Sequence, residues 1–186
     1  YLQQHKNNPV NWQIWNSDTL NEAKNKKLPI LLSVGYASCH WCHVMAHESF
    51  EDDQTAKIMN KNFINIKVDR EERPDLDFVF QSSFQIFNQT SGGWPLTMFL
   101  DENGVPFSGG TYFPKVSNHG LPAFKDLLIN VSETYKIRRE KILNQSSLIK
   151  KSLTLKKNLV INQDLIPILD NVITKLDPIK GGFIGT

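Results

Sequence analysis

Two cysteines separated by two residues are the side chains best suited to chemistry in this sequence. They are the only cysteines of the chain and lie in Ser38-Cys39-His40-Trp41-Cys42-His43. Cysteines this close cannot hold a secreted scaffold together, so they indicate redox, metal or haem chemistry. The apolar run from Leu28 to Val34 predicts a buried strand before the motif, and the Gly- and Pro-free segment from Cys39 to Phe50 predicts a helix that begins at the first cysteine.

The expected position of Cys39 at a helix N-terminus favours thiolate chemistry. Unpaired amides and the positive end of the helix dipole stabilise a thiolate there, and such surroundings lower a cysteine pKa from about 8.5 to roughly 3.5–7.5. We therefore expect Cys39 to attack and Cys42, one turn further in and covered, to resolve the mixed disulfide. His40 and Trp41 lie between the cysteines, and a protonated His40 would favour the thiolate further.

A second candidate element is Trp94-Pro95, which directly precedes the strand expected at Leu96 to Leu100. The cis form of an X-Pro bond costs only about 0.5–1 kcal/mol. A cis proline opposite the cysteines would expose the preceding backbone for pairing with a substrate chain, and we expect this form. The alternative interpretation is a proline that simply begins a strand.

Hydrophobic periodicity predicts alternating strands and helices around these motifs. We expect helices over about 18–27, capped by Ser17, and over 74–87, begun by Pro74, and strands over 63–69, 96–100 and 105–113. Apolar residues from Phe124 to Tyr135 have helical spacing and predict a closing helix. This order predicts an α/β fold with a mixed sheet covered by helices on both faces. Helical segments over about 145–158 and 165–176 lie outside that plan.

Composition excludes several classes of protein. Among the 186 residues, 40% are hydrophobic and 22% charged, which excludes general disorder. A formal net charge of +2 gives no electrostatic case for a nucleic-acid or anionic-membrane partner. No apolar run approaches the roughly 20 residues of a membrane-spanning helix. The chain opens at Tyr1 without a Met, so we expect a piece of a longer, cytoplasmic protein and leave open a targeting signal in the missing N-terminus.

Several motifs together resemble the spermatogenesis-associated thioredoxin-domain family. The resemblance covers about residues 1–114 and rests on Tyr1 to His5, Asn8 to Trp12, Gly35 to Met45, His47 to Phe50, Lys67 to Asp75, Gly92 to Pro95 and Gly109 to Pro114. It implies a thioredoxin fold, with a thioredoxin-like domain over 1–143 and extra C-terminal helices over 144–186. These helices would lead into a missing α-helical toroid domain, whose beginning Asp177 to Gly185 resembles.

The placement of the cysteines, with this fold, predicts a function. We expect thiol–disulfide exchange with a protein or small-molecule substrate, without a cofactor or a metal, and with Cys39 and Cys42 as the catalytic residues. The side chains expected to tune the thiols or contact the substrate are His40, Trp41, His43, Asp69, Trp94 and Pro95. Thioredoxins carry a buried Asp six residues before the first cysteine, where this chain has Ser33. Since serine is a poor base, His43 and Asp69 are candidates to replace it.

Three alternatives remain open from the sequence. The segment Cys39 to His43 also fits the C-x-x-C-H pattern of covalent haem attachment. Zinc is a second alternative, with Cys39, Cys42, His43 and His47 as donors, although a tetrahedral set from one short segment would be strained. The third is a non-catalytic binding module, in which Trp41, Trp94, Tyr112 and Phe113 form a pocket for a partner or for the missing domain.

Overall fold

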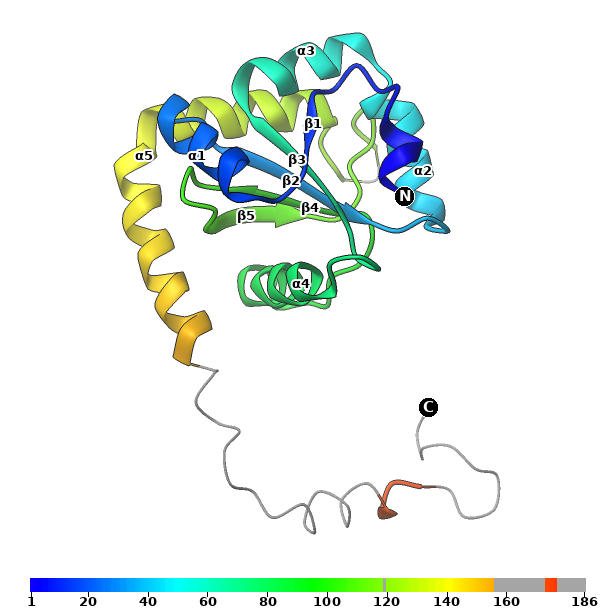
Figure 1. The fold of residues 1–186 in the computed structure, drawn as a ribbon, viewed down its shortest axis with the longest axis vertical. Helices are drawn as coiled ribbons and strands as arrows, with labels where there is room; N and C mark the ends of the chain where they lie inside the picture. The colour runs from blue at the N-terminus through cyan, green and yellow to red at the C-terminus, as the bar shows by residue number, and fades with distance from the viewer. Residues whose placement is uncertain (119, 156–172, 177–186) are drawn as a thin grey trace. The chain divides into compact units, whose positions relative to one another are not determined.

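The computed structural model describes residues 1–118, 120–155 and 173–176. In the unit Tyr1–Lys151, a five-stranded sheet lies between two layers of helices (Figure 1). The strand order is β1-β3-β2-β4-β5. Strands β1 (Trp12–Gln13), β2 (Ile30–Gly35) and β3 (Ile64–Asp69) run parallel to one another. Strand β4 (Leu96–Leu100) pairs antiparallel with β2, and β5 (Pro106–Gly110) pairs antiparallel with β4. The chain therefore has the mixed sheet of a thioredoxin fold.

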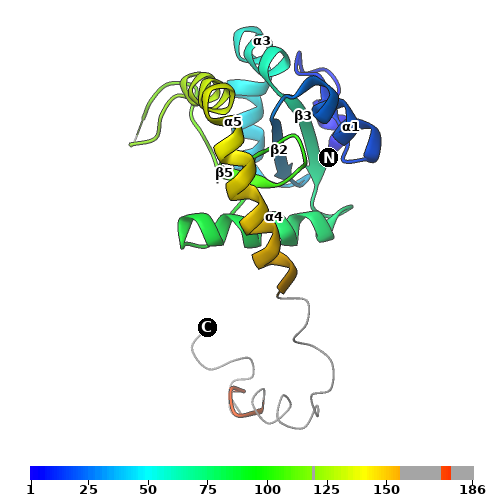
Figure 2. The ribbon, with the colours of Figure 1, turned by 90° about the vertical axis from the view of Figure 1, so that its left-hand side faces the viewer.

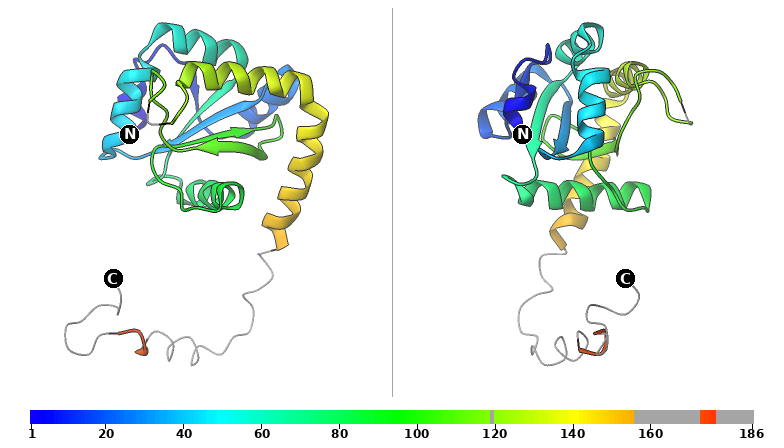
Figure 3. Two further views of the ribbon diagram at one scale, coloured as in Figure 1. Left: turned by 180° about the vertical axis from the view of Figure 1, so that it is seen from behind. Right: turned by 90° about the vertical axis from the view of Figure 1, so that its right-hand side faces the viewer.

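Each face of the sheet has its own apolar core, because side chains alternate along a strand. In β2, Leu32 packs with α1 (Ser17–Lys26) and α4 (Pro74–Asn88). Its neighbour Leu31 faces the opposite way, toward α2 (His40–Met45), α3 (Asp53–Asn62) and the beginning of α5 (Phe124–Leu155). Figures 2 and 3 show α4 on one side of the sheet and α3 with the beginning of α5 on the other.

Local signals predicted several elements correctly. The predicted strands over 63–69 and 96–100 are β3 and β4, and α4 begins with Pro74 in its first turn, as expected. The cap of α1 differs: Asn16, not Ser17, is the N-cap, and its side-chain oxygen accepts a hydrogen bond from the Thr19 amide over 2.8 Å. Ser17 is the first residue of the helix itself.

The helix predicted from Cys39 to Phe50 consists of two parts of different helix type. Helix α2 ends at Met45 and continues as a π-helical turn, Ala46–Phe50. Helix α3 was not predicted. It begins after Asp52, whose carboxylate accepts hydrogen bonds from the amide and hydroxyl of Thr55. The short strand β1 and the 3-10 helix η1 (Leu2–His5) that precedes it were not predicted either.

The C-terminal elements differ most from expectation. Strand β5 ends at Gly110, three residues earlier than predicted. The closing helix and the expected separate helix after 144 form one element, α5, with a kink at Arg138. The boundary expected between 143 and 144 therefore falls inside a helix. The segments over 156–172 and 177–186 lie outside the described residues, including most of the helix expected over 165–176.

Helix α5 is attached to the turn after β4 by a buried polar contact. The Tyr135 hydroxyl donates a hydrogen bond to the Glu102 carboxylate, and Arg139 pairs with the same carboxylate. Tyr135 is 1% exposed, so this contact fixes the helix where it leaves the sheet. None of the helices in the described ranges has the length and apolar character needed to cross a membrane.

Candidate redox site

The cysteine motif lies at the edge of the sheet formed by the C-terminal ends of β2 and β3 and the N-terminal end of β4. Strand β2 ends at Gly35, whose register partner Asp69 ends β3. Strand β4 begins at Leu96, opposite Val34, and runs antiparallel to β2. The N-terminal end of β4 therefore lies beside the C-terminal ends of β2 and β3. The segment Trp94-Pro95 and the cysteine motif thus adjoin the sheet at the same edge, as the sequence order predicted.

Cys39 and Cys42 form a disulfide. Cys39 is the N-cap of α2, and its Sγ accepts a hydrogen bond from the Cys42 amide over 3.2 Å. Cys42 lies within the first turn of the helix. The exposed fractions are 2% for Cys39 and 1% for Cys42, so exposure does not distinguish the two sulfurs, whereas we expected the cover over Cys42 to do so. What distinguishes them is the position of Cys39 at the helix N-terminus.

The Trp94-Pro95 peptide bond is cis, and the Trp94 ring is held on several sides. Its indole Nε1 donates a hydrogen bond to Asp77 on α4 over 2.9 Å. The Arg70 guanidinium lies 3.9 Å from the centre of the Trp94 ring and pairs with Asp77 at 3.6 Å. Tyr36, three residues before Cys39, contacts Trp94 edge to face. Side chains from α4, from the loop after β3 and from the cysteine loop therefore fix Trp94 in place.

The histidines of the motif have separate partners. His40 is exposed and contacts the Trp41 ring. The His43 ring nitrogen Nε2 is 2.9 Å from the carbonyl of Ala37, and exposed His47 pairs with Glu51. The four zinc donors considered from the sequence are not gathered: within residues 1–118, 120–155 and 173–176, no three His, Cys, Asp or Glu side chains are placed to hold a metal ion. Two of those donors are joined in the disulfide.

An aromatic groove of about 400 Å³ lies beside the motif. Trp41 is 53% exposed and packs on Tyr112, whose hydroxyl donates a hydrogen bond to Glu48 over 2.6 Å. Burial and this bond raise the pKa of Tyr112 to about 12. The groove is lined by Trp41, Ser91, Gly92, Gly93, Trp94, Thr111, Tyr112 and Leu121.

One expected member of the aromatic pocket is elsewhere. Phe113 does not line the groove; it is 8% exposed and stacks on Phe124 in the core under α5. Strand β5 ends at Gly110, so the chain turns before Phe113 and carries its ring into the core instead. Trp41, Trp94 and Tyr112 are the predicted pocket residues that the structure brings together.

A buried lysine lies under the edge of the sheet that carries the cysteine motif. It was not among the residues predicted for the site. Lys67 on β3 is opposite Ser33 on β2, and its Nζ donates a hydrogen bond to the Ser33 hydroxyl over 3.0 Å. The Nζ also faces the rings of Tyr1, Trp12 and Phe50 at 4.5–5.1 Å from their centres. Burial lowers the pKa of Lys67 well below its usual 10.5.

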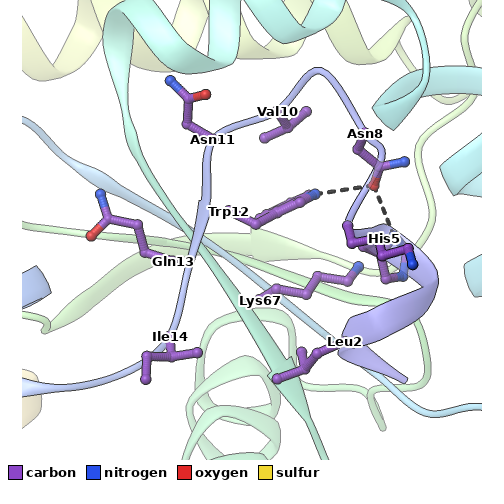
Figure 4. Close-up of a pocket in the computed structure, with 10 residues that line it drawn as sticks. Leu2, His5, Asn8, Val10, Asn11, Trp12, Gln13, Ile14 and Lys67 are labelled. Atoms are coloured by element: carbon purple, nitrogen blue, oxygen red, sulfur yellow. Dashed lines mark hydrogen bonds between the residues drawn. The ribbon is translucent and has the colours of Figure 1, made fainter.

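Lys67 borders a cavity of about 390 Å³ between η1 and β1 (Figure 4). Beside it, the Asn8 side-chain oxygen accepts a hydrogen bond from the Trp12 indole and lies 2.9 Å from His5 Nδ1. Burial, and then the charge of Lys67, lower the pKa of His5 to about 4. A lysine within the apolar run of β3 was the sequence signal for this polar layer.

Asp69, the other candidate to replace the missing aspartate, is buried at the end of β3. Its carboxylate accepts a hydrogen bond from the Glu71 amide over 2.9 Å. Its charge also acts on Tyr1: burial, and then Asp69, raise the pKa of the Tyr1 hydroxyl. Asp69 therefore belongs to the buried polar layer under the cysteine loop, together with Lys67 and Tyr1.

Two solved structures show a loose similarity to this chain. The first, described as "DsbH Oxidoreductase", is 17% identical with a TM-score of 0.48, and the match covers 69% of this chain and 86% of that one. The second, a disulphide isomerase from Xylella fastidiosa, is 16% identical with a TM-score of 0.49, covering 66% and 97% of the two chains.

Curated proteins give much closer matches in sequence. An uncharacterized protein of Caenorhabditis elegans is 46% identical over 151 residues, which cover 81% of this chain and 21% of that protein. Spermatogenesis-associated protein 20 of Homo sapiens is 40% identical over 149 residues, covering 80% and 19%. The chain spans about a fifth of the length of these relatives. Residues 1–154 match the family model Thioredox_DsbH, described as "Protein of unknown function, DUF255". On this match and these identities, the chain belongs to the thioredoxin-domain family that includes spermatogenesis-associated protein 20.

Proposed function

We propose that this chain is a thiol–disulfide oxidoreductase in which Cys39 attacks and Cys42 resolves. The observation that carries the proposal is the position of Cys39 as N-cap of α2, with its Sγ already accepting a hydrogen bond from the Cys42 amide. A thiolate on this sulfur would keep that bond and gain the stabilisation of the helix dipole. Cys42 lies within the first turn of α2 and is not its N-cap, so its thiolate lacks this stabilisation.

The exchange has two steps. The Cys39 thiolate attacks one sulfur of a substrate disulfide, a bond forms between these two sulfurs, and the other substrate sulfur leaves as a thiolate. The Cys42 thiolate then attacks the Cys39 sulfur, which forms the Cys39–Cys42 disulfide and releases the second substrate thiolate. The substrate gains two electrons and the cysteine pair loses two. A dithiol reductant returns the pair to its reduced form.

The groove beside the motif supports a substrate that is a protein segment. Its wall includes the exposed Trp41 ring and Trp94. The Trp94-Pro95 segment leads into β4 at the same sheet edge as the cysteines. In this proposal, the substrate segment lies in the groove and pairs with the backbone at Trp94. Because both sulfurs are covered, its arrival must displace part of that cover.

Reduction of insulin by dithiothreitol tests the activity. The chain should accelerate the precipitation of insulin chains over dithiothreitol alone, and Cys39→Ser should abolish the acceleration because the attacking sulfur is gone. Ser38→Ala, one residue earlier, is the matched control and should retain it. If wild-type chain and dithiothreitol alone give equal rates, the proposed activity is wrong.

A non-catalytic binding module is the second candidate, and one observation favours it. Both sulfurs are almost fully covered, whereas Trp41 beside them is half exposed. A groove of this kind also suits a peptide partner or a further domain of a longer protein. In that case Cys39→Ser would bind the partner as wild type does, and neither protein would turn over a disulfide. The insulin assay therefore separates the two candidates.

A further inference from the structure

A buried tyrosine hydroxyl lies close to the resolving cysteine. The Tyr1 side chain is 0% exposed. Its hydroxyl oxygen is buried and has no hydrogen-bond partner among the residues that the structure describes. A buried polar group without a partner costs folding free energy, so each such group in a native structure calls for an explanation.

Gly35 shows how closely this hydroxyl approaches Cys42. A Cβ atom added to Gly35 would lie 2.3 Å from the Tyr1 hydroxyl oxygen and 2.8 Å from Cys42 Sγ. Both atoms therefore border the space that a side chain at the end of β2 would fill. The absence of a side chain on Gly35 is what lets the phenol and the sulfur lie together against the strand.

We propose that the Tyr1 hydroxyl donates a hydrogen bond to Cys42 Sγ when the cysteine pair is reduced, and thereby stabilises the thiolate that resolves the mixed disulfide. The inference rests on the proposed function and adds a positioning residue to it. In the disulfide, Cys42 Sγ is bonded to Cys39 and is a weak acceptor, and the Tyr1 hydroxyl makes no hydrogen bond to it. After reduction, the same sulfur becomes a strong acceptor as a thiolate.

The other polar groups of this layer are placed differently. The Ser33 hydroxyl, at the position of the thioredoxin aspartate, already accepts a hydrogen bond from Lys67. His43 contacts the carbonyl of Ala37, and Asp69 accepts from the Glu71 amide. Within the described part of the chain, Tyr1 is the group whose donor is unused and adjacent to Cys42 Sγ.

Tyr1 does not exchange its proton in this proposal. Burial and the Asp69 carboxylate raise the pKa of its phenol, so it stays protonated and remains a donor throughout the exchange. Cys42 loses its proton to solvent before it attacks Cys39, and the departing substrate thiolate gains one. The titratable groups around the phenol are Asp69 and Lys67 on β3, and His5 on η1. The Tyr1 amine, which pairs with Asp69 at 3.8 Å, and His43 on α2 both act on His5. All of these groups are retained in the variants below.

Stopped-flow reaction of the reduced chain with a nitrobenzoate disulfide tests the inference, because its coloured thiolate is released twice. The first release is bimolecular and reports attack by Cys39; the second is unimolecular and reports attack by Cys42. In Tyr1→Phe, which keeps the ring, the pH midpoint of the second release should rise by about one unit, and its rate near neutral pH should fall about tenfold. The first release should be unchanged.

Tyr135→Phe is the matched control, since it removes a buried tyrosine hydroxyl that binds Glu102. It should leave both releases unchanged. Replacing Tyr1 by 3-fluorotyrosine, a stronger donor, should lower the midpoint of the second release, and this variant serves if Tyr1→Phe does not fold. An unshifted midpoint, or equal slowing of both releases, would overturn the inference. If the wild-type chain shows both thiolate releases as expected but does not reduce insulin, the proposed function is contradicted and the inference about Tyr1 is not.

Discussion

Lys67 on β3 donates a hydrogen bond to Ser33 on β2, and the lysine that does so is 3% exposed. The pair spans two neighbouring strands under the cysteine loop, where an amine is surrounded by aromatic rings instead of water. Keeping an amine in such a place is unfavourable for its charged form. The pair therefore links the stability of the sheet to the protonation of one buried side chain.

Lys67→Met should make the protein more stable near neutral pH and should weaken the pH dependence of its stability. The folded pKa of Lys67 is lowered, so the unfolded chain binds more protons and the free energy of unfolding rises as pH increases toward 10.5. Methionine removes this cost. We expect the free energy of unfolding to rise by roughly 1–4 kcal/mol, the range typical of buried charged groups replaced by apolar ones.

Urea denaturation at pH 7 and pH 9.5, followed by tryptophan fluorescence, measures the effect. Lys57→Met, at an exposed position of α3, is the matched control and should keep the wild-type pH dependence. A Lys67→Met protein with the same pH slope as wild type would show that the buried amine costs nothing in the folded state.

Acid should destabilise the fold through His5. Burial lowers its pKa from 6.5 to about 4, so between these values the unfolded chain binds the extra proton and stability falls as pH falls. One pKa unit corresponds to about 1.4 kcal/mol, which gives a loss of roughly 3 kcal/mol from this group. His5→Gln should lose that part of the pH slope, whereas His47→Gln, at an exposed site, should retain it. Thermal unfolding at pH 4.5 and pH 7 of the three proteins decides the point.

Cys42→Ser should trap substrates and Cys39→Ser should not. With the resolving sulfur absent, a mixed disulfide through Cys39 persists. With the attacking sulfur absent, Cys42 remains inside the helix without the N-cap position that favours the Cys39 thiolate, so it should react slowly. Non-reducing gels and intact mass after incubation with a disulfide peptide measure the adducts. Equal trapping by both variants would contradict the assignment of Cys39 as the nucleophile.

Trp41→Ala should weaken the reduction of a peptide disulfide more than that of a small aromatic disulfide. Trp41 is 53% exposed on the groove and packs on Tyr112, so its loss removes contact area for an extended segment. We expect KM for the peptide to rise up to about tenfold, the scale of one interface aromatic. Phe78→Ala, at an exposed aromatic of α4 that is not part of the groove, is the control. Identical KM values for both variants would exclude the groove as the substrate site.

Elements with strong local signals were predictable from the sequence. Pro74 marks the first turn of α4, and the β-branched run of β3 is typical of a strand on its own. Helix α3 was missed although Asp52 and Thr55 form a typical N-cap pair. The predicted helix from Cys39 to Phe50 ends where the π-helical turn ends, and no helix was predicted for the residues that follow. Strand β1 has only two residues and exists through its pairing with β3.

The site was predictable as far as chain order determines it. The cysteines and Trp94-Pro95 converge because β2 and β4 are antiparallel neighbours. Tyr1 and Lys67 were not recognised, since their contacts with Gly35 and Ser33 join residues far apart in the sequence. The misplacement of Phe113 has a similar cause: the bend after Gly110 depends on core packing against Phe124, which no local pattern reveals.

The short strands at the two margins of the sheet bear on how the protein behaves in concentrated solution. β1 has two residues, and β5 has five, begins with Pro106 and pairs with β4 through an irregular register near Leu100. Exposed edge strands are templates for pairing with another chain, and short, proline-bearing or irregular edges suppress such pairing. Both margins of this sheet therefore oppose edge-to-edge aggregation.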